Sequence, residues 1–298
     1  MKPLGSTLAA AAILVWAMAM GTLGGLVLTY IEVGMSGSGV SIADGLNRLR
    51  SRPLIVFGLQ WVVFLPVVLH LGPRLGWTRE SIGSASPPRP LHVVGSGLAL
   101  GATLLLAPAL VGRIAGGLVQ APTGPGGPLE VVAVFGILAV GAVGEEVLFR
   151  GILLRVWEAR LGTLGALALT TVIFAIVHAG NPGAGPLGGV GLILAGGLLG
   201  LAALRSGGLW WPSAIHLGWN AAAGLVVGLP VSGVRMPSLL HWAPSTAEGA
   251  EGLWGGSFGP EAGVVFHTAL LIGIVWVARR PPSPDSRSRP IDPGEEAR

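Results

Sequence analysis

Apolar segments long enough to cross a lipid bilayer recur along most of this chain. A spanning helix needs about 20 predominantly apolar residues, and eight segments approach that length. They cover residues 7–30, 52–72, 91–112, 129–149, 162–178, 187–204, 208–229 and 261–279. Only 11% of the residues are charged, whereas 51% are hydrophobic, which is far from the composition of a soluble domain. The sequence therefore predicts an all-α, polytopic transmembrane helix bundle with about eight spanning helices.

The spacing of these segments divides the chain into a membrane core, a loop and a tail. The predicted parts are three N-terminal spans in 1–128, a core in 129–229, an extramembrane loop in 230–260, a final transmembrane helix in 261–280 and a disordered polar tail in 281–298. Interfacial tryptophans Trp242 and Trp254 are expected to anchor the loop, with a lid over the membrane as the alternative reading.

Arginine placement predicts the orientation of this integral, multi-pass membrane protein. Eight spans put both termini on one side, and the arginines of the C-terminal tail make that side cytoplasmic by the positive-inside rule. Arg48, Arg50 and Arg52 disagree, because they would face outward. A bacterial chain of this kind would reside in the cell membrane.

Some chemistry and some partners are excluded by residue type. The chain has no cysteine, so it has no thiol nucleophile, disulfide or thiolate metal site. No run of basic residues interleaved with aromatic ones is present, which argues against nucleic acid as a partner. The lipid bilayer is the partner that the composition does predict.

Three short clusters, in residues 144–150, 174–178 and 216–220, place polar side chains inside the apolar segments. A charge at the centre of a spanning helix costs roughly 2.5–3.5 kcal/mol even on the lenient insertion scale. Such groups therefore usually face an internal polar cavity, and they mark either chemistry or transport.

The first cluster contains two adjacent acids. Helical spacing pairs Glu146 with Arg150 one turn later, so each neutralises the other. Glu145 points about 100° away around the helix, which leaves it free to face a cavity and act as a general base. The alternative is that both acids merely cap a helix at the membrane edge.

The other two clusters supply imidazoles and an amide. Phe174 precedes His178 by one helical turn, so the two rings are expected to stack. His216 and Asn220 share one helix face, where two donors can stabilise a developing oxyanion. A lone histidine is more often a structural residue, and the His216–Asn220 pair is equally consistent with a polar contact between helices.

Together, an acid, two imidazoles and an amide on separate spans can activate a water molecule and stabilise a tetrahedral intermediate. The set Glu145, His178 and His216 can also ligate a divalent metal such as zinc with one open position, although no cofactor is certain. Spacing does not separate these two mechanisms. A proton-coupled transporter, in which the same residues relay protons, and a non-catalytic membrane immunity or scaffold protein are the other hypotheses.

The polar clusters resemble the signature of a known family, the CPBP intramembrane proteases, which include type II CAAX prenyl proteases and bacteriocin-processing relatives. The matching motifs are Glu145-Glu146-x-x-x-Arg150, Phe174-x-x-x-His178 and His216-x-x-x-Asn220. The likeness covers roughly residues 130–225, and the first three spans match nothing in the family.

The resemblance implies an endopeptidase that cleaves a membrane-associated peptide or protein by water attack. Glu145 would activate the water with help from His178, while His216 and Asn220 would stabilise the oxyanion. Glu146, Arg150 and Phe174 would support this arrangement. Members of the family have been described as metalloendopeptidases, which keeps the metal hypothesis open.

Overall fold

The predicted all-α bundle is confirmed. The computed structural model describes residues 3–35, 53–121 and 127–283. Its helices are α1 (Pro3–Met35), α3 (Pro53–Leu71), α4 (Pro90–Ile114), α5 (Pro128–Glu146), α6 (Leu154–Val177), α7 (Pro186–Ser206), α8 (Trp210–Ala221), α9 (Ala250–Trp254) and α10 (Val264–Arg279). The short elements are two 3-10 turns (Gly72–Leu75 and Pro260–Ala262), two π-helical segments (Val147–Leu153 and Ala222–Val227) and the strands β1 (Leu118–Gln120) and β2 (Trp242–Pro244).

Several of these helices are long and apolar enough to cross a membrane, which makes the chain an integral, multi-pass membrane protein. Five candidate spans meet that description among the described residues. The candidates are Thr7–Gly25, Phe57–Leu75, Pro90–Ile114, Pro128–Val177 and Pro186–Ser206, with Val264–Arg279 as a shorter apolar helix. The number of eight spans stays a prediction.

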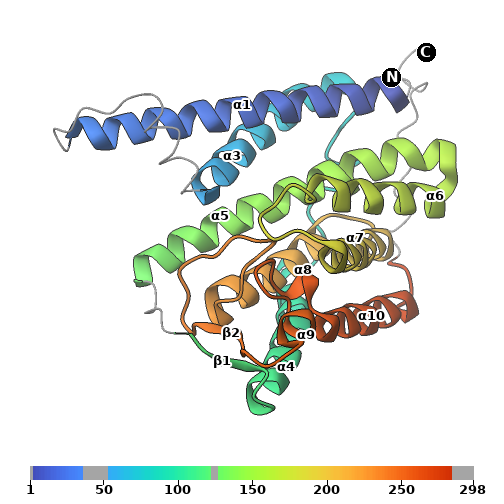
Figure 1. The fold of residues 1–298 in the computed structure, drawn as a ribbon. Helices are drawn as coiled ribbons and strands as arrows, with labels where there is room; N and C mark the ends of the chain where they lie inside the picture. Colours follow the sequence, from blue (N-terminus) through green and yellow to red (C-terminus); the bar gives the residue numbers. More distant parts are fainter. Residues whose placement is uncertain (1–2, 36–52, 122–126, 284–298) are drawn as a thin grey trace.

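The 50-residue segment Pro128–Val177 is bent back on itself. Gly162 interrupts the helix with φ 65° and ψ 171°, a left-handed conformation that glycine tolerates best. The rings of Phe149 and Phe174 lie 5.1 Å apart, whereas a straight helix would separate them by about 37 Å. This segment therefore forms two antiparallel legs, as the separate sequence segments 129–149 and 162–178 predict, and Figure 1 shows the reversal at the right of the bundle.

The helices pack in layers that enclose a space beside α5. Helix α1 packs against α3, α3 against α5, and α7 against both α6 and α10. Figure 1 shows the α1–α3 pair lying over α5, with α8, α4 and α10 on the opposite side of α5. The N-terminal helices, which have no family counterpart in the sequence, thus form one wall of the interior.

Helices α4 and α8 approach each other closely in the bundle core. A Cβ on Gly97 would lie 2.6 Å from that of Ala214, one on Gly101 would collide with the Ile215 carbonyl, and one on Gly218 would press on Leu98. Contacts this close require glycine, as in other membrane helix pairs. They fix the position of α8, the helix that bears His216.

Hydrogen bonds join the connections at each end of the bundle. At one end, the backbone N–H of Ser283 donates to Arg205 and that of Leu209 to Gly83, which gathers arginine-bearing connections together. At the other end, β1 pairs antiparallel with β2. The two predicted sides and the orientation in the membrane stay a prediction. The disagreeing residues Arg48, Arg50 and Arg52, and the tail beyond residue 283, lie outside the described residues.

The loop 230–260 is anchored differently from the expectation. Trp254 is only 7% exposed, packs edge-on against Phe266 and covers Gly112 and Gly117. Its indole therefore ties the loop to the helix bundle, and the prediction of an interfacial anchor at Trp254 is wrong. Burial against protein removes the ring from the headgroup region.

Candidate active site

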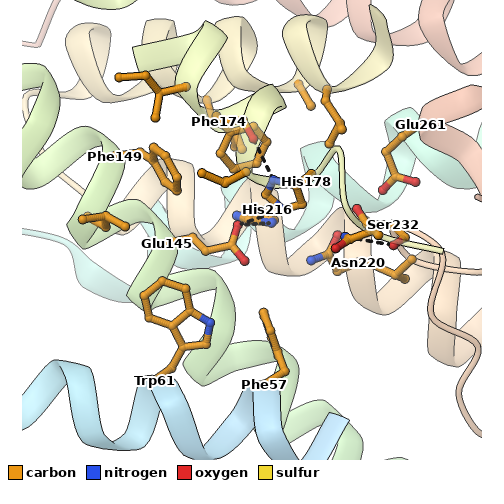
Figure 2. A pocket seen from close by; sticks show the side chains of 18 of the residues that line it. Phe57, Trp61, Glu145, Phe149, Phe174, His178, His216, Asn220, Ser232 and Glu261 are labelled. Carbon is orange, nitrogen blue, oxygen red and sulfur yellow. Dashed lines mark hydrogen bonds and ion pairs between the residues drawn. The ribbon is translucent and has the colours of Figure 1, made fainter. Parts of the chain in front are cut away.

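Glu145 lies at the end of α5, with its side chain facing an internal cavity. The cavity has a volume of about 820 Å³, and its lining comes from both halves of the chain, with Phe57 and Trp61 of α3 on one side and Phe174, His178 and His216 on another (Figure 2). Glu145 is 6% exposed. The chain continues after Glu146 as a π-helix, a geometry that often marks functional sites, where the sequence predicts a regular α-helix.

His178 presents one ring nitrogen to Glu145. Its Nδ1 lies 2.7 Å from the carbonyl oxygen of Phe174. A carbonyl only accepts, so Nδ1 carries a hydrogen and donates. The other nitrogen, Nε2, lies 3.8 Å from Oε2 of Glu145. Because Nδ1 is engaged, Nε2 is the atom of His178 that is available to the cavity.

His216 lies between the two adjacent acids. Its Nδ1 is 3.0 Å from Oε1 of Glu146, and its Nε2 is 4.0 Å from Oε2 of Glu145. A carboxylate partner on Nδ1 fixes the orientation of the imidazole, as in many catalytic and metal-bound histidines. The sequence predicts a role for Glu146 only toward Arg150, so this second contact of Glu146 is new.

Glu146 and Arg150 form a buried ion pair that also ties α7 to this region. The guanidinium Nη1 donates to Oε1 of Glu146 at 2.9 Å, and Nη2 donates to the carbonyl of Gly196 at 3.1 Å. The guanidinium carbon also lies 4.7 Å from the ring centroid of Phe174. Both charged residues are almost fully buried, so each depends on the other for neutralisation.

Phe174 packs between these charges and the imidazoles. Its ring centroid is 4.6 Å from that of His178 and 6.4 Å from that of His216. The predicted contact between Phe174 and His178 is therefore present. Through it, one aromatic ring holds both imidazoles and excludes solvent from the ion pair.

Asn220 is half-buried and follows His216 by one turn of α8. Figure 2 shows its carboxamide beside Ser232, farther from Glu145 than the two imidazoles are. Both Asn220 and Ser232 line the cavity. The predicted site residues thus lie around one space, with the acid and imidazoles in the closest contact.

Among the described residues, no group of three or more His, Cys, Asp or Glu side chains is arranged to hold a metal ion. The predicted metal set of Glu145, His178 and His216 therefore does not fit in this geometry, although its atoms approach within 4.0 Å. The description as a metalloendopeptidase is not supported.

Trp61 and Glu261 are among the cavity residues that sequence reasoning missed. Trp61 of α3 lies against Gly144, the residue before Glu145, and Glu261 lies in the turn before α10. Glu261 Oε1 accepts a 3.3 Å hydrogen bond from the indole of Trp219. No motif or spacing marks either residue, because both reach the cavity only through the packing of helices distant in sequence.

The fold and the site together define a multi-pass membrane protein with a buried acid–imidazole centre. Residues 127–222 match the family model of the type II CAAX prenyl endopeptidases, described as Rce1-like. This match confirms the resemblance found in the sequence and supports, at the level of the family, an intramembrane CAAX-type endopeptidase. No curated protein and no solved structure matches the chain.

Proposed function

We propose that this protein is an intramembrane endopeptidase in which Glu145 activates water for attack on a peptide bond. The substrate is a membrane-associated protein or peptide of the CAAX or bacteriocin type. One observation carries the proposal. Among the described residues, Oε2 of Glu145 is buried without a hydrogen-bond partner, while two imidazole nitrogens face it within 4.0 Å.

The distances around Glu145 suit a shared water molecule. Separations of 3.8 Å and 4.0 Å exceed direct hydrogen-bond length. A water oxygen placed roughly 2.8 Å from both the carboxylate oxygen and an imidazole nitrogen would make an angle of about 90° between them. Because Nδ1 of His178 donates to a carbonyl, Nε2 of the neutral ring accepts from this water. Glu145 takes the other proton of the water, while the water oxygen attacks the scissile carbonyl carbon.

Charge balance favours a protonated His216. The cluster holds two carboxylates, Glu145 and Glu146, and one guanidinium, Arg150. A proton on His216 brings its net charge to zero, the least costly state in a medium of low dielectric constant. With Nδ1 donating to Glu146, the Nε2–H of His216 is free to stabilise the oxyanion.

Collapse of the tetrahedral intermediate completes the reaction. Asn220 follows His216 by one turn on α8 and offers a second donor to the oxyanion. Glu145 then passes the proton taken from water to the leaving nitrogen, and the carbon–nitrogen bond breaks. Water is consumed, and a carboxyl and an amine terminus are formed.

The test is turnover of a fluorogenic, prenylated CAAX-type peptide by the purified protein in proteoliposomes. Glu145→Gln keeps the shape of the side chain but removes the base, so at least about 100-fold of turnover should be lost. Glu80→Gln is the matched control, because Glu80 is exposed in a connection between helices. Retention of more than about a tenth of wild-type turnover by Glu145→Gln would contradict the role of Glu145.

Two further measurements separate the other hypotheses and the substrates. Tracer uptake into the same proteoliposomes that depends on Glu145, without hydrolysis, would favour a proton-coupled transporter. Mass spectrometry of membrane peptides from cells that express the wild type or Glu145→Ala should identify products formed only by the wild type. Identical peptide profiles would favour a non-catalytic scaffold.

A further inference from the structure

A second acid lines the cavity on the side away from Glu145. Glu261 lies in the 3-10 turn Pro260–Ala262, in the loop that precedes α10, and is 3% exposed. It shares the cavity with Glu145 and His216. Figure 2 shows its carboxyl group near Ser232 and across the cavity from Glu145.

Three contacts hold Glu261 in this position. Trp219, on the same turn of α8 as His216, donates its indole N–H to Oε1 at 3.3 Å. His267 donates from Nε2 to the main-chain carbonyl of Glu261 at 2.8 Å. Gly191 of α7 lies so close that a Cβ there would collide with the same carbonyl. Groups from three helices therefore hold Glu261, one at its carboxyl group and two at its main-chain carbonyl.

One oxygen of this carboxyl group lacks a hydrogen bond in the described part of the chain. Oε2 of Glu261 is buried and has no hydrogen-bond partner among the described residues, although buried polar atoms are normally paired. Burial raises the pKa of Glu261 to about 7, so a neutral carboxyl is well populated near neutral pH. Because Oε1 accepts from Trp219, the proton of the neutral form belongs on Oε2.

We propose that Glu261 is a substrate-binding residue whose Oε2–H donates a hydrogen bond to a main-chain carbonyl of the bound peptide, close to the scissile bond. This inference rests on the proposed peptidase function. A peptide offers a carbonyl acceptor at every residue, so the contact works for any side-chain sequence. It explains why a carboxyl group with an unpaired atom is held against the cavity by Trp219, on the same turn of α8 as His216.

Two substitutions of Glu261 separate binding from folding. Glu261→Leu removes the donor and should raise KM about tenfold, the loss expected for one buried hydrogen bond, with little change in kcat. Glu261→Gln keeps both an acceptor for Trp219 and a donor toward the cavity, so it should recover most of the affinity. A purely structural role would instead lower kcat and melting temperature together, and a KM unchanged in Glu261→Leu would overturn the proposal.

A modified substrate locates the contact. Replacement of single peptide carbonyls by thioamides, which accept hydrogen bonds poorly, should raise KM for the wild type at one position near the scissile bond. The same thioamide should have no effect on Glu261→Leu, because the contact is already lost. Equal effects of every thioamide on both proteins would overturn the proposal.

Gly191→Ala and Gly189→Ala test the position of Glu261 without altering its side chain. A methyl group on Gly191 pushes on the Glu261 carbonyl, whereas one on Gly189 has open space. We expect KM to rise in Gly191→Ala alone. An equal KM in the two variants would contradict the importance of the position of Glu261.

Binding keeps this test separate from the test of hydrolysis. Affinity for the prenylated peptide is compared between Glu145→Ala and Glu145→Ala/Glu261→Leu, neither of which needs to cleave it. Weaker binding by the double variant supports the inference, and equal binding overturns it alone. A wild-type protein that neither binds nor cleaves the peptide overturns the proposed function as well.

Discussion

Arg150→Met should destabilise the protein strongly while leaving the cavity lining in place. Arg150 is 2% exposed. Its removal leaves Glu146 as a buried charge whose remaining hydrogen-bond partner, among the described residues, is His216. It also leaves the Gly196 carbonyl without the guanidinium donor. Loss of one partner from a buried ion pair typically costs about 3–5 kcal/mol. With roughly 2–4 °C per kcal/mol for a chain of this size, the melting temperature should fall by at least about 6 °C.

The assay is thermal unfolding of the purified protein in detergent. Arg160→Met is the matched control, because it removes an exposed arginine from the same helical hairpin. Adding Glu146→Gln to Arg150→Met should restore part of the loss, since the orphaned charge is then gone. The reasoning fails if Arg150→Met melts within about 2 °C of Arg160→Met, or if the double variant melts lower than Arg150→Met.

Three further outcomes are expected. Gly101→Ala should lower the melting temperature and turnover, because the new methyl group overpacks α8 at an expected cost of about 1–3 kcal/mol, whereas Gly95→Ala faces open space and should do neither; equal effects would refute this packing argument. The pKa of Glu261 is raised to about 7 from an ordinary 4.5. As the pH rises above about 4.5, folding must therefore either protonate this carboxyl group or bury its charge. The wild type should therefore lose about 3 kcal/mol relative to Glu261→Gln between about pH 4 and pH 8, and parallel melting curves across this range would contradict it. Exhaustive chelation should leave turnover intact, because no metal-holding group is found among the described residues; activity that chelation removes and zinc restores would overturn this expectation.

The helical architecture was predictable because lipid leaves few choices for the backbone. Apolar segments near 20 residues must become helices when no water can satisfy their amides, and the break between residues 149 and 162 falls where Gly162 reverses the chain. The Glu146–Arg150 pair follows from helical spacing alone. These features depend on local sequence, which is why local reasoning finds them.

Contacts between distant segments were not predictable in the same way. The distance from Glu146 to His216 depends on how α8 packs against α4 and α5, and nothing in residues 144–150 specifies it. Glu261 sits outside every motif, and its place in the cavity depends on Gly191 and His267. A single sequence contains no direct record of such pairings.

The two adjacent glutamates show how packing divides one chemistry into two tasks. Glu146 accepts hydrogen bonds from Arg150 and His216 at the same oxygen, Oε1. Its charge therefore holds the imidazole and the guanidinium in place. Glu145 has equal intrinsic basicity. Among the described residues, Oε2 lacks a hydrogen bond in both acids, but that of Glu145 also faces two imidazole nitrogens within 4.0 Å. A buried carboxylate oxygen without a hydrogen bond gains most from binding a water molecule or accepting a proton. Either contact offsets the cost of burying the charge on folding. The supporting ion pair is therefore what allows Glu145 to remain both buried and reactive.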